Sequence, residues 1–145
     1  MAERILVIDD ELDMLMLLRM IIEENTGYEV ETTNNPSEGL KMLTERNYDL
    51  VISDLKMPGM DGLELFEELH KIRSDIPVII ITAYGSPEAA DEALKKGVAD
   101  FITKPFRKDT ILFIMRRVLE LAKVKKENIE LKKRLDEQSR SHPEN

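Results

Sequence analysis

The stretch ILVIDDE, residues 5–11, runs from four apolar residues directly into three acidic ones. A short apolar run bounded by polar residues is typical of a strand that is buried on both faces of a sheet. Three adjacent carboxylates repel one another, and each raises the pKa of its neighbours unless a cation offsets the charge. The stretch therefore predicts a buried strand whose carboxyl end carries a site for a positively charged group.

Similar apolar runs alternate along the chain with amphipathic helical patterns. The predicted strands are residues 5–8, 30–33, 50–53, 78–81 and 101–103. The helical patterns cover residues 13–25, 36–46, 63–73 and 87–96. Five β-α repeats of this length indicate an α/β fold, in which a five-stranded parallel sheet is covered by helices on both faces.

Capping residues agree with these helix boundaries. Asn35 and Ser86 are each followed by a proline, which is the pattern of an N-cap residue before the first helical position. Gly27 and Gly97 are placed to form helix C-terminal caps.

The composition restricts the class of protein. A chain of 145 residues that is 42% hydrophobic can form one domain with its own core, and a net charge of -8 argues against binding of a nucleic-acid backbone. The sequence has no cysteine and two histidines, which excludes disulfides and thiolate metal sites. It has no secretory signal and no apolar run of membrane-spanning length, so we expect a soluble cytoplasmic protein that does not contact a membrane.

The C-terminal third follows a different pattern. From about residue 108 the sequence is compatible with a helix that continues without glycine or proline to residue 141, longer than a globular domain usually contains. We predict three parts: a domain over residues 1–120, a coiled-coil linker helix over 121–138 and a disordered tail over 139–145.

Residues 121–138 fit a heptad repeat. The a and d positions, which would form a dimer seam, hold Leu121, Val124, Asn128, Leu131, Leu135 and Gln138. The flanking e and g positions hold Glu120, Lys125, Glu127 and Lys132, which can pair across a parallel dimer. Asparagine at an a position favours a coiled coil of two helices in a fixed register, so we predict a homodimer.

A lone solvated helix is the alternative to this coiled coil. A DNA-binding basic zipper is disfavoured, because acidic and basic residues are interleaved.

Polar and charged residues gather at the carboxyl ends of four predicted strands. They are Asp9, Asp10 and Glu11 after the first strand, Asp54 after the third, Thr82 after the fourth and Lys104 after the fifth. Taken singly, each has a structural explanation as a helix N-cap, a strand-end hydroxyl or a solvated lysine. Ligands of open parallel sheets bind beyond the carboxyl ends of the strands, so together these residues indicate one site.

The residue types at this site point to phosphoryl transfer. Oxygen ligands alone favour a hard cation, and an open cluster of carboxylates suits Mg²⁺. A lysine and a hydroxyl opposite the cation can neutralise and bind a phosphoryl group. The sequence contains no glycine-rich phosphate loop, so the phosphoryl group must come from another molecule. A carboxylate can accept it as an aspartyl phosphate, and Asp54 is the predicted acceptor.

Four segments of the chain resemble the receiver domains of bacterial two-component response regulators. They are LVIDDE (6–11), DLVISDLKMPGMDGLEL (49–65), ITAYG (81–85) and DFITKPF (100–106), and the resemblance covers about residues 3–120. It implies a flavodoxin-like, doubly wound sheet with strand order 2-1-3-4-5, followed here by the extended C-terminal helix.

The resemblance also implies a role for individual residues. Asp54 becomes the phospho-acceptor, Asp10 a direct Mg²⁺ ligand and Asp9 an acidic partner that acts on the metal through water. Asp54 also takes part in binding the metal, and the backbone carbonyl of Lys56 becomes the third protein ligand of Mg²⁺.

Four further positions take roles in switching. Thr82 is the hydroxyl that moves towards the phosphoryl group, and Lys104 is its counter-charge. Pro105 follows Lys104 in a cis linkage. Phe101 is the aromatic residue that reports phosphorylation by its burial, without the hydroxyl that a tyrosine would provide.

The implied function is a phosphorelay switch and not a turnover enzyme. A cognate sensor histidine kinase phosphorylates Asp54 in an Mg²⁺-dependent reaction, the domain dephosphorylates itself, and the dimer arrangement changes to control an output domain. The segment KENIELKKRL (126–135) resembles the linker of sigma-54-dependent transcriptional activators, in which an ATPase domain follows.

The alternative function is that of a haloacid-dehalogenase-type phosphatase, which requires an aspartate two residues after its nucleophile. Glu11 and Lys56 occupy the corresponding positions here.

Overall fold

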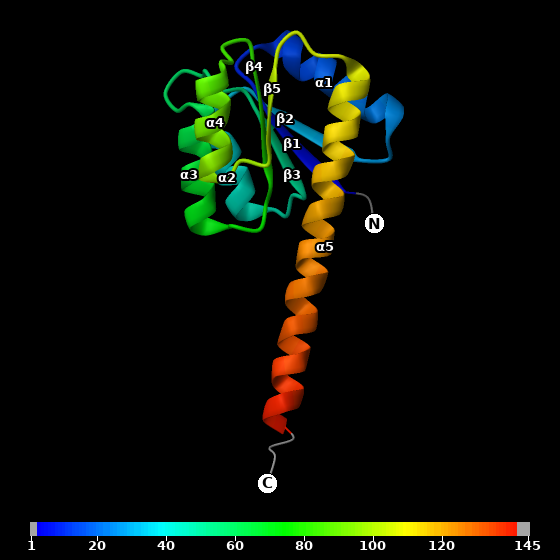
Figure 1. Cartoon of the computed structure of the whole chain (residues 1–145). Helices are drawn as coiled ribbons and strands as arrows, with labels where there is room; N and C mark the ends of the chain where they lie inside the picture. The colour runs from blue at the N-terminus through cyan, green and yellow to red at the C-terminus, as the bar shows by residue number, and fades with distance from the viewer. Residues whose placement is uncertain (1–2, 142–145) are drawn as a thin grey trace.

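The computed structural model describes residues 3–141 of the chain, with the side chains of residues 3–137. Strands and helices alternate along it (Figure 1). In order they are β1 (Arg4–Ile8), α1 (Leu12–Asn25), β2 (Glu29–Thr33), α2 (Pro36–Glu45), β3 (Leu50–Ser53), α3 (Gly62–Ile72), β4 (Val78–Thr82), α4 (Pro87–Lys96), β5 (Asp100–Thr103) and α5 (Lys108–Ser141). The predicted α/β alternation is confirmed.

The five strands form one parallel sheet in the order β2-β1-β3-β4-β5, which confirms the predicted topology. The pairing register brings the strand ends together. Ile8, the last residue of β1, lies opposite both Thr33 of β2 and Ser53 of β3. Thr82 of β4 lies opposite Thr103 of β5. The residues that follow these strands therefore leave the sheet along one edge.

Helices cover both faces of the sheet, and each face has its own core. Alternate strand residues point to opposite faces, so that Leu6 and Ile8 pack with α2, α3 and α4, whereas Ile5 and Val7 pack with α1 and α5. Figure 1 shows the two helical layers on either side of the sheet. The centre of the sheet is buried on both faces, which explains its continuous runs of Val, Ile and Leu.

Three of the four predicted helix caps are confirmed. The Asn35 side chain accepts hydrogen bonds from the first turn of α2, and the Ser86 side chain accepts one from the first turn of α4. Gly97 ends α4 in the left-handed conformation, with φ of 113°. The prediction for Gly27 was wrong. Helix α1 ends at Asn25, and its C-cap residue is Thr26, whose extended backbone needs no glycine and whose hydroxyl donates a 2.7 Å hydrogen bond to the Ile22 carbonyl.

Helix α5 is a single unbroken helix of 34 residues. Its first part packs on the sheet through Ile111, Met115 and Val118, and the rest projects beyond the domain (Figure 1). The helix continues to Ser141, three residues into the tail that was predicted to be disordered. Residues 142–145 and the Gln138 side chain lie outside the described part. Within residues 3–141, no helix combines the length and the apolar character needed to cross a membrane.

Candidate functional site

Backbone hydrogen bonds fix the residues that follow the strands. The amide of Asp54 donates to the carbonyl of Ile8 at 3.0 Å, and the amide of Lys104 donates to the carbonyl of Thr82 at 2.8 Å. The amide of Asp9 donates to the carbonyl of Thr33 at 3.3 Å. These bonds extend the sheet ladder one residue past the strand ends. The acidic and basic side chains of the site therefore start from rigid backbone.

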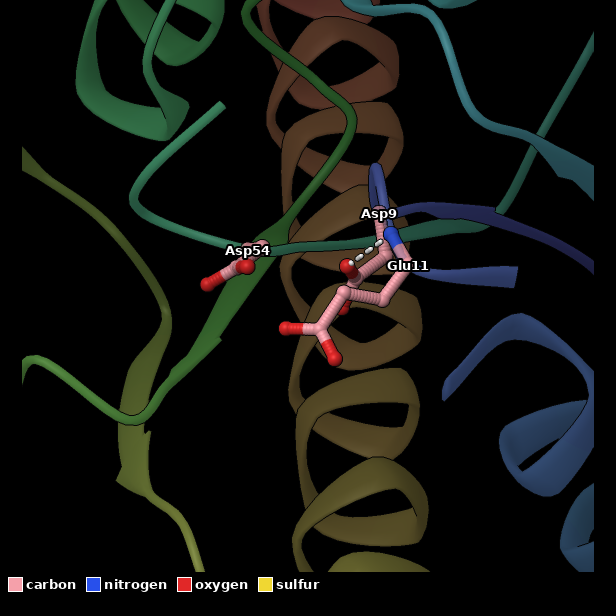
Figure 2. A group of neighbouring side chains, drawn as sticks. All are labelled: Asp9, Glu11 and Asp54. Carbon is pink, nitrogen blue, oxygen red and sulfur yellow. Dashed lines mark hydrogen bonds between the residues drawn. The ribbon is translucent and has the colours of Figure 1, made fainter. Parts of the chain in front are cut away.

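Three carboxylates converge at this edge of the sheet. Asp9, Glu11 and Asp54 each place one carboxylate oxygen within 4.8 Å of the others (Figure 2). Asp9 and Asp54 are 2% and 5% exposed, whereas Glu11 is exposed. Asp10, the predicted direct metal ligand, is also exposed and lines the adjoining pocket, but it does not belong to this group of three.

The electrostatics of the cluster favour binding of a cation. Burial raises the pKa of Asp9 to about 6, and the carboxylate of Asp54 adds to that rise. A 2.9 Å hydrogen bond from the amide of Glu11 and the nearby ammonium of Lys104 act in the opposite direction. Lys104 Nζ lies 3.5 Å from Asp9 Oδ2 and 3.9 Å from Asp54 Oδ2. One lysine thus faces two buried carboxylates.

The donor set fits a hard divalent cation. It offers only oxygen ligands, and two of them come from carboxylates that are costly to bury ionised without a partner. Mg²⁺ keeps several waters and binds through one or two carboxylates, which agrees with a cluster that opens on one side. The residues present therefore match the metal that the sequence predicts.

An open pocket of about 520 Å³ adjoins the carboxylates. Its lining includes Asp10, Glu11, Asp54, Lys56 and Tyr84. Asp54, although only 5% exposed, is one of the residues that line this pocket.

The remaining predicted residues surround the same edge. Thr82 is fully buried, and its hydroxyl accepts a 3.0 Å hydrogen bond from the amide of Tyr84. The peptide bond between Lys104 and Pro105 is cis, as predicted. Phe101 is half-buried and packs on the core formed with α3 and α4. The ring of Phe101 also lies beside Gly85, where a Cβ atom would come within 3.2 Å of it.

The predicted dimer seam is uncovered in the single chain. Leu121, Val124, Leu131 and Leu135 are between 43% and 62% exposed, and Asn128 is exposed on the same part of α5. Four large apolar side chains on one projecting helix form a surface that a second helix could cover.

Sequence reasoning did not identify every residue at the site. Glu11 was noted only as part of an acidic run, and its position beside Asp54 depends on how the chain turns after β1. Ser53 and Gly62 contact the backbone of Asp54. Ser53 was predicted only as the last residue of a strand, and Gly62, one residue before the predicted helix 63–73, was given no role. A contact with a backbone carbonyl has no sequence motif, because every residue has a backbone carbonyl.

Comparison with known proteins gives a consistent result. Residues 5–116 match the family described as response regulator receiver domain. The chain is 42% identical over 116 residues to the transcriptional regulatory protein GlrR of Escherichia coli (strain K12), a match that covers 80% of this chain and 26% of that protein. It is 36% identical over 134 residues to the nitrogen assimilation regulatory protein NtrX of Azorhizobium caulinodans, covering 91% and 29% respectively. The chain therefore spans less than a third of the length of these relatives.

Solved structures agree. NtrX from Brucella abortus in complex with ADP superposes with a TM-score of 0.84 at 36% identity, covering 90% of this chain and 30% of that one. A response regulator receiver domain protein from Clostridium thermocellum superposes with a TM-score of 0.79 at 33% identity, covering 84% and 98%. These matches favour the receiver interpretation over the haloacid-dehalogenase alternative.

Proposed function

Because this chain belongs to the response regulator receiver domain family, whose members are regulatory proteins and not turnover enzymes, we propose that it is a switch phosphorylated on Asp54 by a sensor histidine kinase. The observation that carries the proposal is the environment of Asp54. Its carboxylate is buried at the sheet edge, and Oδ2 lies 3.9 Å from Lys104 Nζ. A carboxylate oxygen of Asp9, the second buried acid, lies within 4.8 Å of an oxygen of Asp54. Such an arrangement suits a carboxylate that accepts a phosphoryl group.

The acidic residues would hold Mg²⁺. The proposed ligands are the carboxylates of Asp10 and Asp54 and the carbonyl of Lys56, with Asp9 acting through water. Glu11 adds a further carboxylate oxygen near Asp9 and Asp54. When bound, Mg²⁺ supplies positive charge that offsets the charge of the transferring phosphoryl group. The family's Mg²⁺ role thus agrees with the excess of buried negative charge at this edge.

Lys104 and Thr82 would bind the phosphoryl oxygens. Lys104 already faces Asp54 and Asp9, so a phosphoryl group on Asp54 offers it an additional anionic partner. Thr82 would exchange its bond with the amide of Tyr84 for one to the phosphoryl group, and Phe101 would change its burial in response. Slow self-dephosphorylation would then reset the switch.

The output is proposed to be transcriptional control. Relatives named as transcriptional regulatory proteins are more than three times as long as the segment that matches this chain. The coiled-coil segment also resembles the linker of sigma-54-dependent activators. The exposed seam on α5 supports a homodimer. Phosphorylation is proposed to change how its two chains are arranged. No direct contact of this segment with nucleic acid is proposed, because the chain is acidic.

Intact-mass measurement tests the acceptor directly. The protein is treated with acetyl phosphate and Mg²⁺, and separately with the same donor in the presence of EDTA. We expect one phosphoryl adduct that depends on Mg²⁺ and is absent from Asp54→Asn. An adduct that persists in Asp54→Asn would refute the assignment. Steady turnover of a generic phosphate ester by the pure protein would instead support the phosphatase.

A further inference from the structure

We propose that Ser53 and Gly62 are positioning residues, which fix the orientation of the Asp54 carboxylate through the peptide group that joins Asp54 to Leu55. The inference rests on the proposed function, because it concerns how Asp54 presents one oxygen to a phosphoryl donor. Neither residue touches the donor. Both act on the backbone.

The first observation concerns the two ends of one peptide group. Ser53 is fully buried, and its hydroxyl donates a 2.9 Å hydrogen bond to the carbonyl oxygen of Asp54. The amide of Leu55 donates a 2.8 Å hydrogen bond to Oδ1 of Asp54. This carbonyl and this amide belong to the same planar unit, so they rotate together. A hydroxyl that holds the carbonyl end therefore also sets the direction of the amide that holds the carboxylate.

The second observation is the close approach of Gly62, the first residue of α3. A Cβ atom on Gly62 would overlap the carbonyl oxygen of Asp54 and lie 3.2 Å from its carbonyl carbon. Gly62 does not have a positive φ, so the glycine is required by space and not by backbone conformation. Its amide also donates a 2.8 Å hydrogen bond to the carbonyl of Leu55. The carbonyl of the Asp54–Leu55 peptide group is thus bonded by the Ser53 hydroxyl and closely approached by the backbone of α3, which also bonds the next carbonyl along the chain.

These contacts distinguish the two oxygens of the acceptor. Oδ1 is engaged by the amide of Leu55, whereas Oδ2 lies 3.9 Å from Lys104 Nζ. Oδ2 is the oxygen left to form the new bond to phosphorus. As that bond forms, the bond from phosphorus to the donor's leaving atom breaks, and the leaving group departs with its electron pair. A carboxylate free to rotate would spend part of its time with neither oxygen in this direction, which lowers the rate of transfer.

The test compares Ser53→Ala with Ser53→Thr in the full chain, because threonine restores the hydroxyl. Acetyl phosphate is the donor, at saturating Mg²⁺, and adduct formation is followed by intact mass over a range of donor concentrations. We expect Ser53→Ala to lower the limiting rate constant about five- to tenfold, since small displacements of a reacting group are costly. The donor concentration at half-maximal rate should stay within about twofold, because Ser53 does not contact the donor. Ser53→Thr should recover most of the rate.

The amide resonance of Leu55 supplies a readout that a merely structural role would not move. In ¹H–¹⁵N spectra of Ser53→Ala, this resonance should shift and exchange faster with solvent than in the parent, as its bond to Oδ1 weakens. The matched control is Thr33→Val, which removes another buried hydroxyl at a strand end, one whose hydrogen bonds are to the backbone of Asn35. That variant should keep the parent rate and the parent Leu55 resonance.

Gly62→Ala is the second variant, since its added Cβ would displace the same carbonyl. A folded Gly62→Ala protein with a lowered rate and a shifted Leu55 resonance supports the proposal. If Ser53→Ala and Gly62→Ala both fold and react at the parent rate, or if Thr33→Val loses as much rate as Ser53→Ala, the positioning role is overturned. The parent protein is measured first. If it forms no adduct on Asp54, the result contradicts the proposed function and not only the positioning role.

Discussion

Arg117, on α5, donates a 2.7 Å hydrogen bond to the carboxylate of Asp100, the first residue of β5. The other oxygen of this carboxylate accepts a 2.8 Å hydrogen bond from the amide of Phe101. A single side chain thus joins the backbone of the proposed switch residue to the helix that leaves the domain. We regard this link as a route by which movement at β5 reaches α5.

Asp100→Asn should therefore weaken coupling without affecting phosphorylation. The adduct on Asp54 should form at the parent rate, and because Arg117 is half exposed the free energy of unfolding should change by less than about 1 kcal/mol. The change in solution shape caused by beryllofluoride, measured by small-angle X-ray scattering, should become smaller. Asp91→Asn, which removes an exposed pair with Lys95 on α4, is the control. An undiminished response in Asp100→Asn would exclude this route.

Mg²⁺ binding distinguishes the roles of Asp10 and Glu11. We expect Asp10→Ala to raise the apparent Kd for Mg²⁺ by at least about tenfold, since even loss of an outer-shell partner costs that much. Without metal, the same variant should be at least as stable as the parent, because one of several repelling charges is gone. Calorimetric titration and thermal unfolding in EDTA measure these two effects. Glu11→Gln, titrated in parallel, tests whether the carboxylate that lies beside Asp9 and Asp54 also binds the metal. An Asp10→Ala protein that binds Mg²⁺ like the parent would show that Asp10 is not a ligand.

The free energy of unfolding should fall at alkaline pH because of Tyr48. Burial, together with a 2.8 Å hydrogen bond to Glu31, raises the pKa of Tyr48 to about 12. The neutral phenol is therefore favoured in the folded state. The contribution of Tyr48 to the free energy of unfolding is fully present below the ordinary pKa of 10 and is lost as the pH rises through about 12. Urea unfolding at a series of alkaline pH values should show a smaller decline for Tyr48→Phe than for the parent. Tyr84→Phe, at an exposed phenol, is the control, and parallel curves for Tyr48→Phe and the parent would contradict the prediction.

The seam on α5 predicts the oligomeric state. The full chain should be a dimer at tens of micromolar by sedimentation, and a chain cut at about residue 120 should dissociate more readily. Leu131→Asp should weaken the dimer because it places a charge in the seam, whereas Lys133→Asp on the outer face of the helix should not. Beryllofluoride should change the arrangement of the two receivers, with a coupling of roughly 1–3 kcal/mol. A full chain that is monomeric with and without beryllofluoride would leave Asn128 as a surface residue.

Much of the fold could be predicted from sequence because its determinants are local. Apolar runs without alternation mark strands buried on both faces, and proline after Asn35 and Ser86 marks two helix starts. Strand order came instead from resemblance, since each strand of a parallel sheet fits several neighbours equally well. Gly27 was misread because the hydroxyl of Thr26 bonds to the carbonyl of Ile22 and so supports the helix end in place of a left-handed glycine.

At the site, sequence predicted which residues meet but not how they are oriented. The carboxyl ends of parallel strands share one edge, so the convergence of Asp9, Asp54 and Lys104 follows from the fold class. Whether Asp10 or Glu11 turns towards Asp54 depends on the backbone after Ile8, which no residue pattern specifies. The contact of Ser53 with a backbone carbonyl is likewise invisible in the sequence, because the partner atom is present in every residue.

Helix α5 has no break between the part that packs on the sheet and the part that projects from it. At 1.5 Å per residue, the roughly 20 residues beyond Leu121 form an arm about 30 Å long. A rotation of about 10° at the base of such an arm moves its tip by roughly 5 Å, about the height of one helical turn. A small rotation where α5 leaves the domain would therefore become a sideways displacement of several ångströms at the end of the helix, where a second helix of the predicted dimer would pack.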